Sequence, residues 1–164
     1  MCMPRIAFYP TTHPIFSIIM SYEEKNIRVL PEDTDAFGRL NWRVYCRYCE
    51  QGEAGLMERL GFTPMYFHKI HRISFPRRAA HFEYVAPVSP ENLIDLETEV
   101  KKVGITSITL SHTFYKKRSE QSERTLTAKA KVTVVAYDDR LHEKTELPRK
   151  LVHTLKALGI QKED

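Results

Sequence analysis

The chain of 164 residues is poor in cysteine and has no long apolar run. Its three cysteines, Cys2, Cys46 and Cys49, are too few for the disulfide framework of a small secreted domain, so we expect a reducing, cytoplasmic location. The longest apolar stretch, residues 15–20, is far shorter than the roughly 18 residues of a membrane-spanning helix. Prolines also interrupt the first 19 residues, which is unlike a signal peptide. The sequence therefore predicts neither a disulfide scaffold nor a membrane span.

The chain also lacks a dense block of charge of one sign. Its 25 basic and 21 acidic residues give a net charge of +4 that is spread along the sequence. There is no zinc-finger spacing, ribonucleoprotein aromatic motif or Lys/Arg stripe, so we expect no nucleic-acid partner. A mild positive balance does suit a small acidic ligand, such as one that carries phosphates.

Length and composition indicate a single domain. The hydrophobic fraction of 42% and the charged fraction of 28% are close to the averages for globular proteins. We expect an N-terminal appendage at residues 1–19, the domain itself at residues 20–148, and a short C-terminal helix with a tail at residues 149–164. Met20, just before the first strand-like segment, could serve as an alternative start.

One long helix is predicted after Asn41, a residue type that favours the N-cap position. Apolar or small side chains then recur at helical spacing up to Gly61, which is typical of the position just beyond a helix. Gly52 and Gly55 each cost about 1 kcal/mol relative to alanine in an exposed helix interior. We therefore expect this helix to lie close against a sheet.

The remaining pattern has the period of two that is typical of half-buried strands. Long alternations cover residues 94–101, 107–114 and 126–136, and Gly104 fits a hairpin turn between the first two. Shorter strands are expected at residues 25–30, 73–75 and 82–85. A strand, a long helix and then a run of antiparallel strands predict an α+β fold with one helix packed on one sheet.

A candidate site lies in the polar loop before the helix. Asp35 stands six residues ahead of Asn41. A helix N-terminus offers unpaired N–H groups that can bind a carbonyl oxygen as it becomes an oxyanion, while a nearby carboxylate can attack or can deprotonate water. Taken alone the pattern is weak, because acidic loops before helices usually only cap the helix or face solvent.

Two motifs around this loop resemble the 4-hydroxybenzoyl-CoA thioesterase family of hotdog-fold enzymes. The segment 33–38 matches its D-x-D-x-x-G pattern, and the segment 45–50 matches its Y-x-x-Y-x-E pattern. Residues 84–87 and 104–107 also look like family landmarks. The resemblance implies a hotdog fold, an antiparallel sheet wrapped around one long central helix, and hydrolysis of an acyl-CoA thioester to a free carboxylic acid and CoA.

Carried over by position, the resemblance implies that Asp35 is the catalytic carboxylate, as nucleophile or as general base for water. It implies that the backbone N–H of Trp42 polarises the thioester carbonyl and that Tyr45 lies in or near the substrate pocket. It further places Asn41 and the pair Thr106 and Ser107 in contact with substrate. The family often has G-H-V-N-N where this chain has G-R-L-N-W, which leaves the shape of the acyl group open.

The resemblance also implies a homodimer or homotetramer whose active site is shared between two subunits. No cofactor is expected, because CoA is part of the substrate, and no metal site is expected. The CoA phosphates would meet surface cations, first of all Arg77 and Arg78. Further candidates, each of which could equally be an ordinary surface charge, are Lys101, Lys102, Lys116, Lys117 and Arg118.

Three other features favour structural roles. Cys46 and Cys49 lie within the predicted helix and indicate packing rather than a redox or zinc site. His112 falls on the apolar face of a strand and is expected in the core. Glu50 is expected to pair with Arg47 or Arg43. The nearby acids Glu32 and Asp33 are expected to raise the pKa of Asp35.

Two other functions fit the same sequence. An acyl-carrier-protein thioesterase would need the same carboxylate and a basic rim, and it would hydrolyse carrier-linked rather than CoA-linked chains. A non-catalytic hotdog domain would bind acyl ligands or scaffold partners without turnover, although a scaffold has no chemical need for a carboxylate ahead of a helix N-terminus.

Overall fold

The computed structural model describes residues 21–63 and 65–157 of the chain. The N-terminal appendage expected at residues 1–19 lies outside these residues. In chain order the elements are β1 (Ser21–Arg28), η1 (Pro31–Asp33), α2 (Trp42–Arg59), α3 (Tyr66–His71), β2 (Ile73–Ser74), β3 (Arg77–Tyr84), β4 (Leu93–Val103), β5 (Ser107–Lys117), β6 (Thr125–Val135), β7 (Tyr137–Asp138), β8 (Glu143–Lys144) and α4 (Arg149–Ala157).

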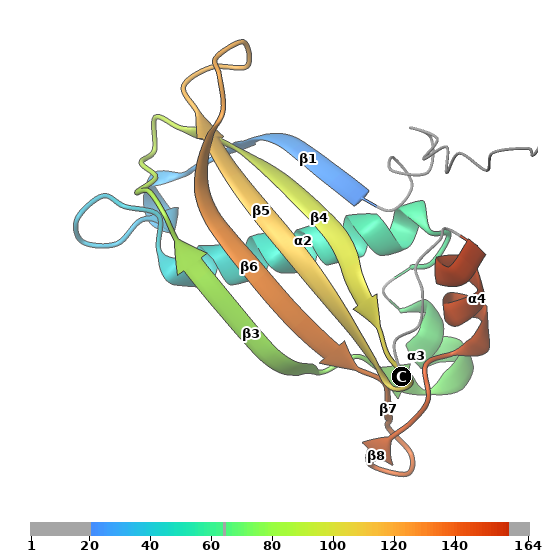
Figure 1. Ribbon diagram of the computed structural model, residues 1–164. Helices are drawn as coiled ribbons and strands as arrows, with labels where there is room; N and C mark the ends of the chain where they lie inside the picture. The colour runs from blue at the N-terminus through green and yellow to red at the C-terminus, as the bar shows by residue number, and fades with distance from the viewer. Residues whose placement is uncertain (1–20, 64, 158–164) are drawn as a thin grey trace, which may run out of the picture.

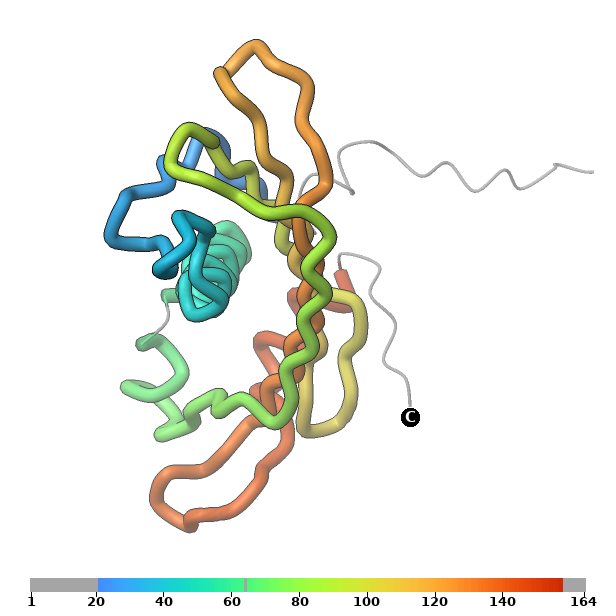
Figure 2. Tube along the Cα trace, turned by 90° about the vertical axis from the view of Figure 1, so that its left-hand side faces the viewer, coloured from blue at the N-terminus to red at the C-terminus, as the bar shows by residue number. Residues whose placement is uncertain are grey.

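A five-stranded antiparallel sheet in the order β1-β4-β5-β6-β3 forms one layer, and α2 lies along one of its faces (Figure 1). Figure 2 shows the sheet edge-on with α2 on its inner side. A second, small sheet joins β2, β7 and β8. This arrangement confirms the predicted α+β hotdog fold.

The caps of α2 explain where the helix starts and stops. Asn41 is the N-cap, and its side-chain oxygen accepts a hydrogen bond from the Arg43 N–H at 3.1 Å. At the other end Gly61 has φ +83°, a left-handed conformation that glycine adopts without the steric cost of a Cβ. The long helix predicted from the sequence is confirmed at both ends.

Gly52 brings α2 unusually close to the sheet. A methyl group added at Gly52 would overlap Oγ1 of Thr98 on β4. A methyl group at Gly55 would instead overlap the ring of Tyr22 on β1. Thr98 is fully buried, whereas Tyr22 is only partly buried and its ring can move. The two glycines therefore let the helix approach β4 and β1, as the sequence predicted.

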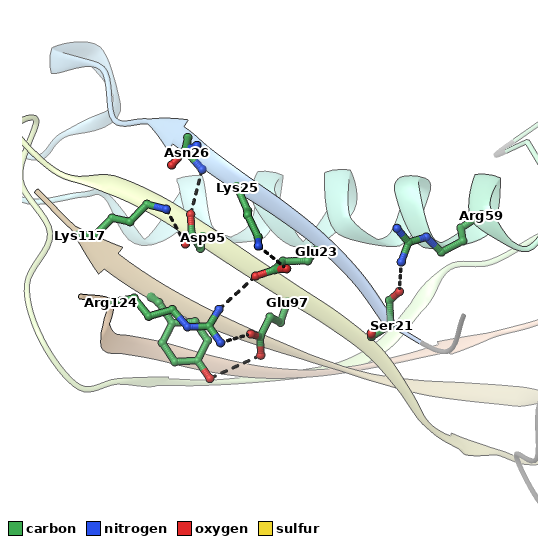
Figure 3. Close-up of polar contacts among 10 residues, drawn as sticks. Ser21, Glu23, Lys25, Asn26, Arg59, Asp95, Glu97, Lys117 and Arg124 are labelled. Atoms are coloured by element: carbon green, nitrogen blue, oxygen red, sulfur yellow. Dashed lines mark hydrogen bonds and ion pairs between the residues drawn. The ribbon is translucent and has the colours of Figure 1, made fainter. Parts of the chain in front are cut away.

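The strands β4, β5 and β6 confirm the predicted alternation, whereas β1 and β3 differ from it: β3 begins at Arg77 rather than at residue 82 and is exposed along most of its length. β4 and β5 are each three residues longer than predicted, and β6 begins and ends one residue earlier than predicted. β1 begins at Ser21 rather than at Lys25. Its polar residues form a strand because they pair with β4. A bulge at Asn26, with φ 60°, turns the Asn26 N–H toward the Asp95 carboxylate at 2.9 Å (Figure 3).

The Asp95 carboxylate also holds Lys117, so an ion pair joins β4 to β5. The Lys117 Nζ lies 2.8 Å from Asp95 Oδ2, and both side chains are buried (Figure 3). Burial alone would raise the pKa of Asp95, but the hydrogen bonds from Lys117 and from the Asn26 N–H outweigh it and lower that pKa. The charge of Lys117 is thus already neutralised inside the fold.

The C-terminal helix α4 packs into the same hydrophobic core as α2. Leu151 and Leu155 on its apolar face are buried, in agreement with the short helix predicted near residues 149–158. Helix α3 was not predicted, since its six residues mix aromatic and basic side chains. None of the helices in the described part of the chain is long and apolar enough to cross a membrane.

We predict that Gly52→Ala destabilises the fold although alanine is the better helix former. Overpacking against Thr98 should lower the free energy of unfolding by about 1–3 kcal/mol, which exceeds the roughly 1 kcal/mol that the higher helix propensity of alanine adds. Gly55→Ala is the matched variant and should cost less, because Tyr22 can move aside. Urea denaturation of both variants checks this, and a Gly52→Ala protein more stable than wild type would contradict the close packing.

Candidate active site

The Asp35 loop is a compact turn held by backbone hydrogen bonds. The N–H of Asp35 donates to the carbonyl of Arg39 at 2.7 Å, and the N–H of Gly38 donates to the carbonyl of Asp35 at 3.0 Å. Gly38 has φ +69°, which favours glycine at this point. The N–H of Leu40 then donates to the carbonyl of Val88 at 2.8 Å, which ties the loop to the segment before β4.

The Asp35 side chain uses one of its two oxygens within the loop. Oδ1 accepts from the N–H of Phe37 at 2.9 Å and from the N–H of Arg39 at 3.0 Å. These two bonds, Arg39 first, lower the pKa of Asp35. Among the described residues no donor is bonded to Oδ2, which therefore remains open to a ligand or to water.

Two expectations about neighbouring carboxylates were wrong. Neither Glu32 nor Asp33 raises the pKa of Asp35, because the backbone donors dominate and Asp33 turns away. Asp33 is buried and accepts from Arg47 at 2.7 Å. Glu50 pairs with neither Arg47 nor Arg43. Its partner is Arg77 on β3, at 3.7 Å.

The N-terminus of α2 directly follows this loop (Figure 1, left). The capping bonds use the N–H groups of Arg43 and Val44 and leave the N–H of Trp42 unpaired among the described residues. Partial positive charge collects at such a helix end, so an acceptor with developing negative charge is stabilised there. The Trp42 side chain is 63% exposed and Phe37 is 82% exposed, so apolar surface faces solvent beside the carboxylate.

Tyr45 lies one turn into α2 and points into the molecule. It is buried, and its ring makes edge contacts with Tyr84 at 5.2 Å and with Phe114 at 5.1 Å between centroids. Burial raises the pKa of the Tyr45 hydroxyl. Tyr84 at the end of β3 is half exposed, so this aromatic cluster continues from the core to the surface near the helix start.

The predicted substrate residues fall into two groups. Asp35, Asn41, Trp42 and Tyr45 come together at the start of α2, where the Asn41 side chain is engaged as the helix cap. Residues Thr106, Ser107, Arg77 and Arg78 lie at the opposite end of the sheet, since Ser107 pairs with Val135 and Arg77 with Val134 (Figure 1, lower right). One protomer does not bring the two groups together.

Arg77 is also engaged, because its guanidinium lies 2.5 Å from Glu53 Oε2 in addition to the contact with Glu50. Its predicted role in holding phosphate stays a prediction, as do the roles of the other residues of that group. Glu53 went unnoticed in the sequence, where it looks like an ordinary helix-surface acid. His112, by contrast, is fully buried and shares a hydrogen bond with Thr98 at 3.1 Å, which confirms it as a core residue.

A basic groove of about 510 Å³ opens beside the Asp35 loop. Its walls come from that loop, from the segment between β3 and β4, and from the ends of β5 and β6. Four cations line it against a single acid, Glu123. These cations are Arg39, Lys116, Lys117 and Arg118. Since Lys117 is tied to Asp95 and Lys116 reaches the carbonyl of Pro87 at 2.5 Å, Arg39 and Arg118 are the least committed.

The arrangement combines a carboxylate oxygen, a helix N-terminus and a groove for negative charge. Such a set can hold an activated acyl group, stabilise its oxyanion and deliver a nucleophile or base. Cys49 is buried and its pKa is raised by that burial, which leaves its thiol unreactive. Within residues 21–63 and 65–157, no three His, Cys, Asp or Glu side chains are grouped so that they could hold a metal ion.

Comparison with known proteins identifies the family and agrees with the fold. An acyl-CoA thioester hydrolase, YbgC of Escherichia coli O6:H1, is 27% identical over 130 residues, which cover 79% of this chain and 92% of YbgC. The 4-hydroxybenzoyl CoA thioesterase of Pseudomonas sp. strain CBS-3 superposes with a TM-score of 0.72 at 18% identity, over 82% of this chain and 99% of that one. The DHNA-CoA thioesterase of Staphylococcus aureus gives a TM-score of 0.72 at 15% identity, over 85% and 89%. The family model of the thioesterase-like superfamily matches residues 29–155, and the chain belongs to this superfamily.

Proposed function

We propose that the protein hydrolyses acyl-CoA thioesters, with Asp35 and the Trp42 N–H as its catalytic groups. The observation that carries the proposal is the Asp35 carboxylate, one oxygen of which has no donor among the described residues, in the loop that leads into a helix whose first N–H, that of Trp42, is likewise unpaired there. The activities in the names of YbgC and of the structural relatives support the same reaction.

The reaction divides into attack on the carbonyl carbon and loss of the thiolate. With Asp35 as general base, water attacks while the carboxylate takes its proton, and the oxyanion accepts a hydrogen bond from the Trp42 N–H. The C–S bond then breaks as the carbonyl re-forms, and the proton passes to the CoA thiolate. With Asp35 as nucleophile, its free oxygen displaces the thiolate and water hydrolyses the resulting anhydride. Either course ends in a carboxylic acid and CoA and needs no cofactor.

The basic groove beside the Asp35 loop is the place we propose for the CoA phosphates. Arg39 belongs both to the groove and to the loop that supports the carboxylate, so the groove begins at the reactive loop. The pantetheine arm, which separates the CoA phosphates from the thioester, would lie between that loop and the phosphates. Arg118 offers a second guanidinium with bidentate donors. This assignment shifts the expected phosphate contacts from Arg77, whose charge two glutamates already occupy, to the opposite end of the sheet.

A homodimer or homotetramer is proposed because β3 is an edge strand without a neighbour on its outer side in the described chain. Seven of its eight residues are exposed, including its last residue Tyr84, and exposed Val85 follows the strand. An antiparallel copy of β3 would satisfy the open backbone groups and cover this edge. The same pairing would bring Arg77 of one copy beside Tyr84 of the other, so that the two groups of site residues meet.

We predict that Asp35→Asn lowers kcat for acyl-CoA hydrolysis by about 10²–10⁴-fold, the usual contribution of a catalytic acid or base. Asparagine can still accept the Phe37 and Arg39 N–H groups, so the loop should keep its shape. Thiol release from a panel of short, long and aromatic acyl-CoAs measures the effect. Glu32→Gln, which removes an exposed carboxylate three residues away, is the control and should retain activity.

The outcomes separate the competing functions. Unchanged turnover in Asp35→Asn would mean that another carboxylate acts. Turnover of carrier-linked but not CoA-linked chains would establish the acyl-carrier-protein thioesterase instead. Binding of acyl-CoA without turnover of either form by the wild type would establish the non-catalytic binding domain.

We further predict that kcat/KM is flat with pH between about pH 5 and 7. The backbone donors hold the pKa of Asp35 below its ordinary value near 4, so the carboxylate stays ionised throughout this range and protonates only at more acidic pH. Because kcat/KM reports the free enzyme, an acid limb with a midpoint above pH 5 that moves in Asp35→Glu would contradict this electrostatic account.

A further inference from the structure

A second, apolar pocket of about 490 Å³ lies under the C-terminal half of α2. It is enclosed by α2, by the inner face of the sheet, and by α3 and α4. The volume falls within the range of about 300–1,000 Å³ that is usual for ligand sites. Unlike the basic groove, it shares no residue with the Asp35 loop.

The floor of the pocket is a row of side chains that α2 leaves partly uncovered. Val100, Ile108, Leu110 and Val134 retain 5–8% exposure, whereas Ile94, Leu96 and Phe114 further along the same strands retain none. The four form one patch, since Val100 pairs with Leu110 and Ile108 with Val134. Helix α2 contacts mainly β4 and β1, so the inner face of β5 and β6 remains open on this side.

The walls are aliphatic or flexible, with contributions from Leu56, Met57, Leu60, Leu151 and Leu155. Polar side chains lie where the pocket meets solvent, and Glu50, His68 and Arg77 there are each at least 40% exposed at the side chain. Inside, the only polar lining groups among the described residues are the Glu53 carboxylate, whose buried Oε1 lacks a hydrogen-bond partner, and the Ser74 hydroxyl, which donates to Asp139. Away from these two, a hydroxyl or amide of a ligand would lose its water without gaining a partner, at a cost of about 1–3 kcal/mol. The site is thus suited to an unsubstituted chain whose polar end stays at the mouth.

Polar side-chain contacts lie between the mouth of the pocket and the buried core. Glu53 accepts from Arg77 at 2.5 Å and lies 3.6 Å from the Nε2 of buried His112. Arg77, on the edge strand β3, thus holds the carboxylate to the side through Oε2, while Oε1 lies beside His112 without a hydrogen bond. A chain that enters past Arg77 therefore comes from the β3 side of the molecule.

We infer that this pocket binds the saturated acyl chain of the thioester, and that the chain enters it from Asp35 of a second copy. In one protomer, Glu53 lies about 16 Å along α2 from Trp42, at 1.5 Å per residue, and the helix lies between. Antiparallel pairing of two β3 strands brings Arg77 at the mouth beside Tyr84 near the other copy's reactive carboxylate. The inference rests on the proposed function and extends it to medium and long aliphatic chains.

Ala54→Phe tests the pocket, because Ala54 lines it and a phenyl ring would fill it. Ala54→Ser changes polarity with little change of volume and is the matched control. With butanoyl-CoA and dodecanoyl-CoA as substrates, the wild type should favour the longer chain, since each buried methylene is worth about fourfold in binding. Ala54→Phe should lower kcat/KM for dodecanoyl-CoA at least tenfold, chiefly through KM, and lower kcat/KM for butanoyl-CoA much less.

A binding measurement keeps this test separate from the catalytic one. Displacement of a fluorescent fatty acid by dodecanoate should occur in the wild type and in Ala54→Ser and be lost in Ala54→Phe. Ile108→Phe fills the same space from the sheet and should give the same result if Ala54→Phe fails to fold. Chain binding without any thioester hydrolysis would overturn the proposed function and support the pocket. Hydrolysis with equal chain preference in wild type and Ala54→Phe would overturn the pocket alone.

Discussion

The close approach of α2 to β4 at Gly52 is the constraint on which the rest of the structure depends. With no side chain at this position the helix rests against Thr98, and Gly55 lets it rest against Tyr22 of β1. Because α2 lies against β4 and β1, the inner face of β5 and β6 stays partly uncovered and forms the floor of the apolar pocket, to whose walls α3 and α4 contribute. The same position of the helix fixes its N-terminus beside the Asp35 loop.

At that N-terminus, backbone groups rather than charged side chains set the electrostatics. Two N–H groups hold one oxygen of Asp35 and lower its pKa, and the helix end adds partial positive charge nearby. The acids that stand beside Asp35 in sequence have little influence, since Asp33 is occupied by Arg47. The carboxylate is therefore held in place and favoured in its ionised form before any ligand arrives, which is the preorganisation that the proposed catalysis requires.

The sequence predicted the parts of the fold that local patterns control. Strand alternation follows from one face being buried, and the ends of α2 follow from Asn41 and Gly61. It missed features that only tertiary contacts decide. Ser21–Arg28 becomes a strand through pairing with β4 despite its polar residues, and α3 gains order from packing of Phe67.

For the site, a short sequence motif located the Asp35 loop, but the sign of its pKa shift depends on N–H directions that a sequence does not contain. The predicted partners of Glu50 were wrong because its actual partner, Arg77, is distant in sequence and adjacent only in the fold. The apolar pocket depends on how α3, α4 and the sheet meet. Its residues look like ordinary core positions along the chain.

The most direct measurement of the central claim is a crystal structure of Asp35→Asn with dodecanoyl-CoA bound. The account predicts the thioester carbonyl oxygen about 2.7–3.1 Å from the Trp42 backbone nitrogen, with residue 35 facing the carbonyl carbon. A carbonyl bound beyond hydrogen-bond distance of Trp42, or placed against Glu50 or Glu53 instead, would contradict it.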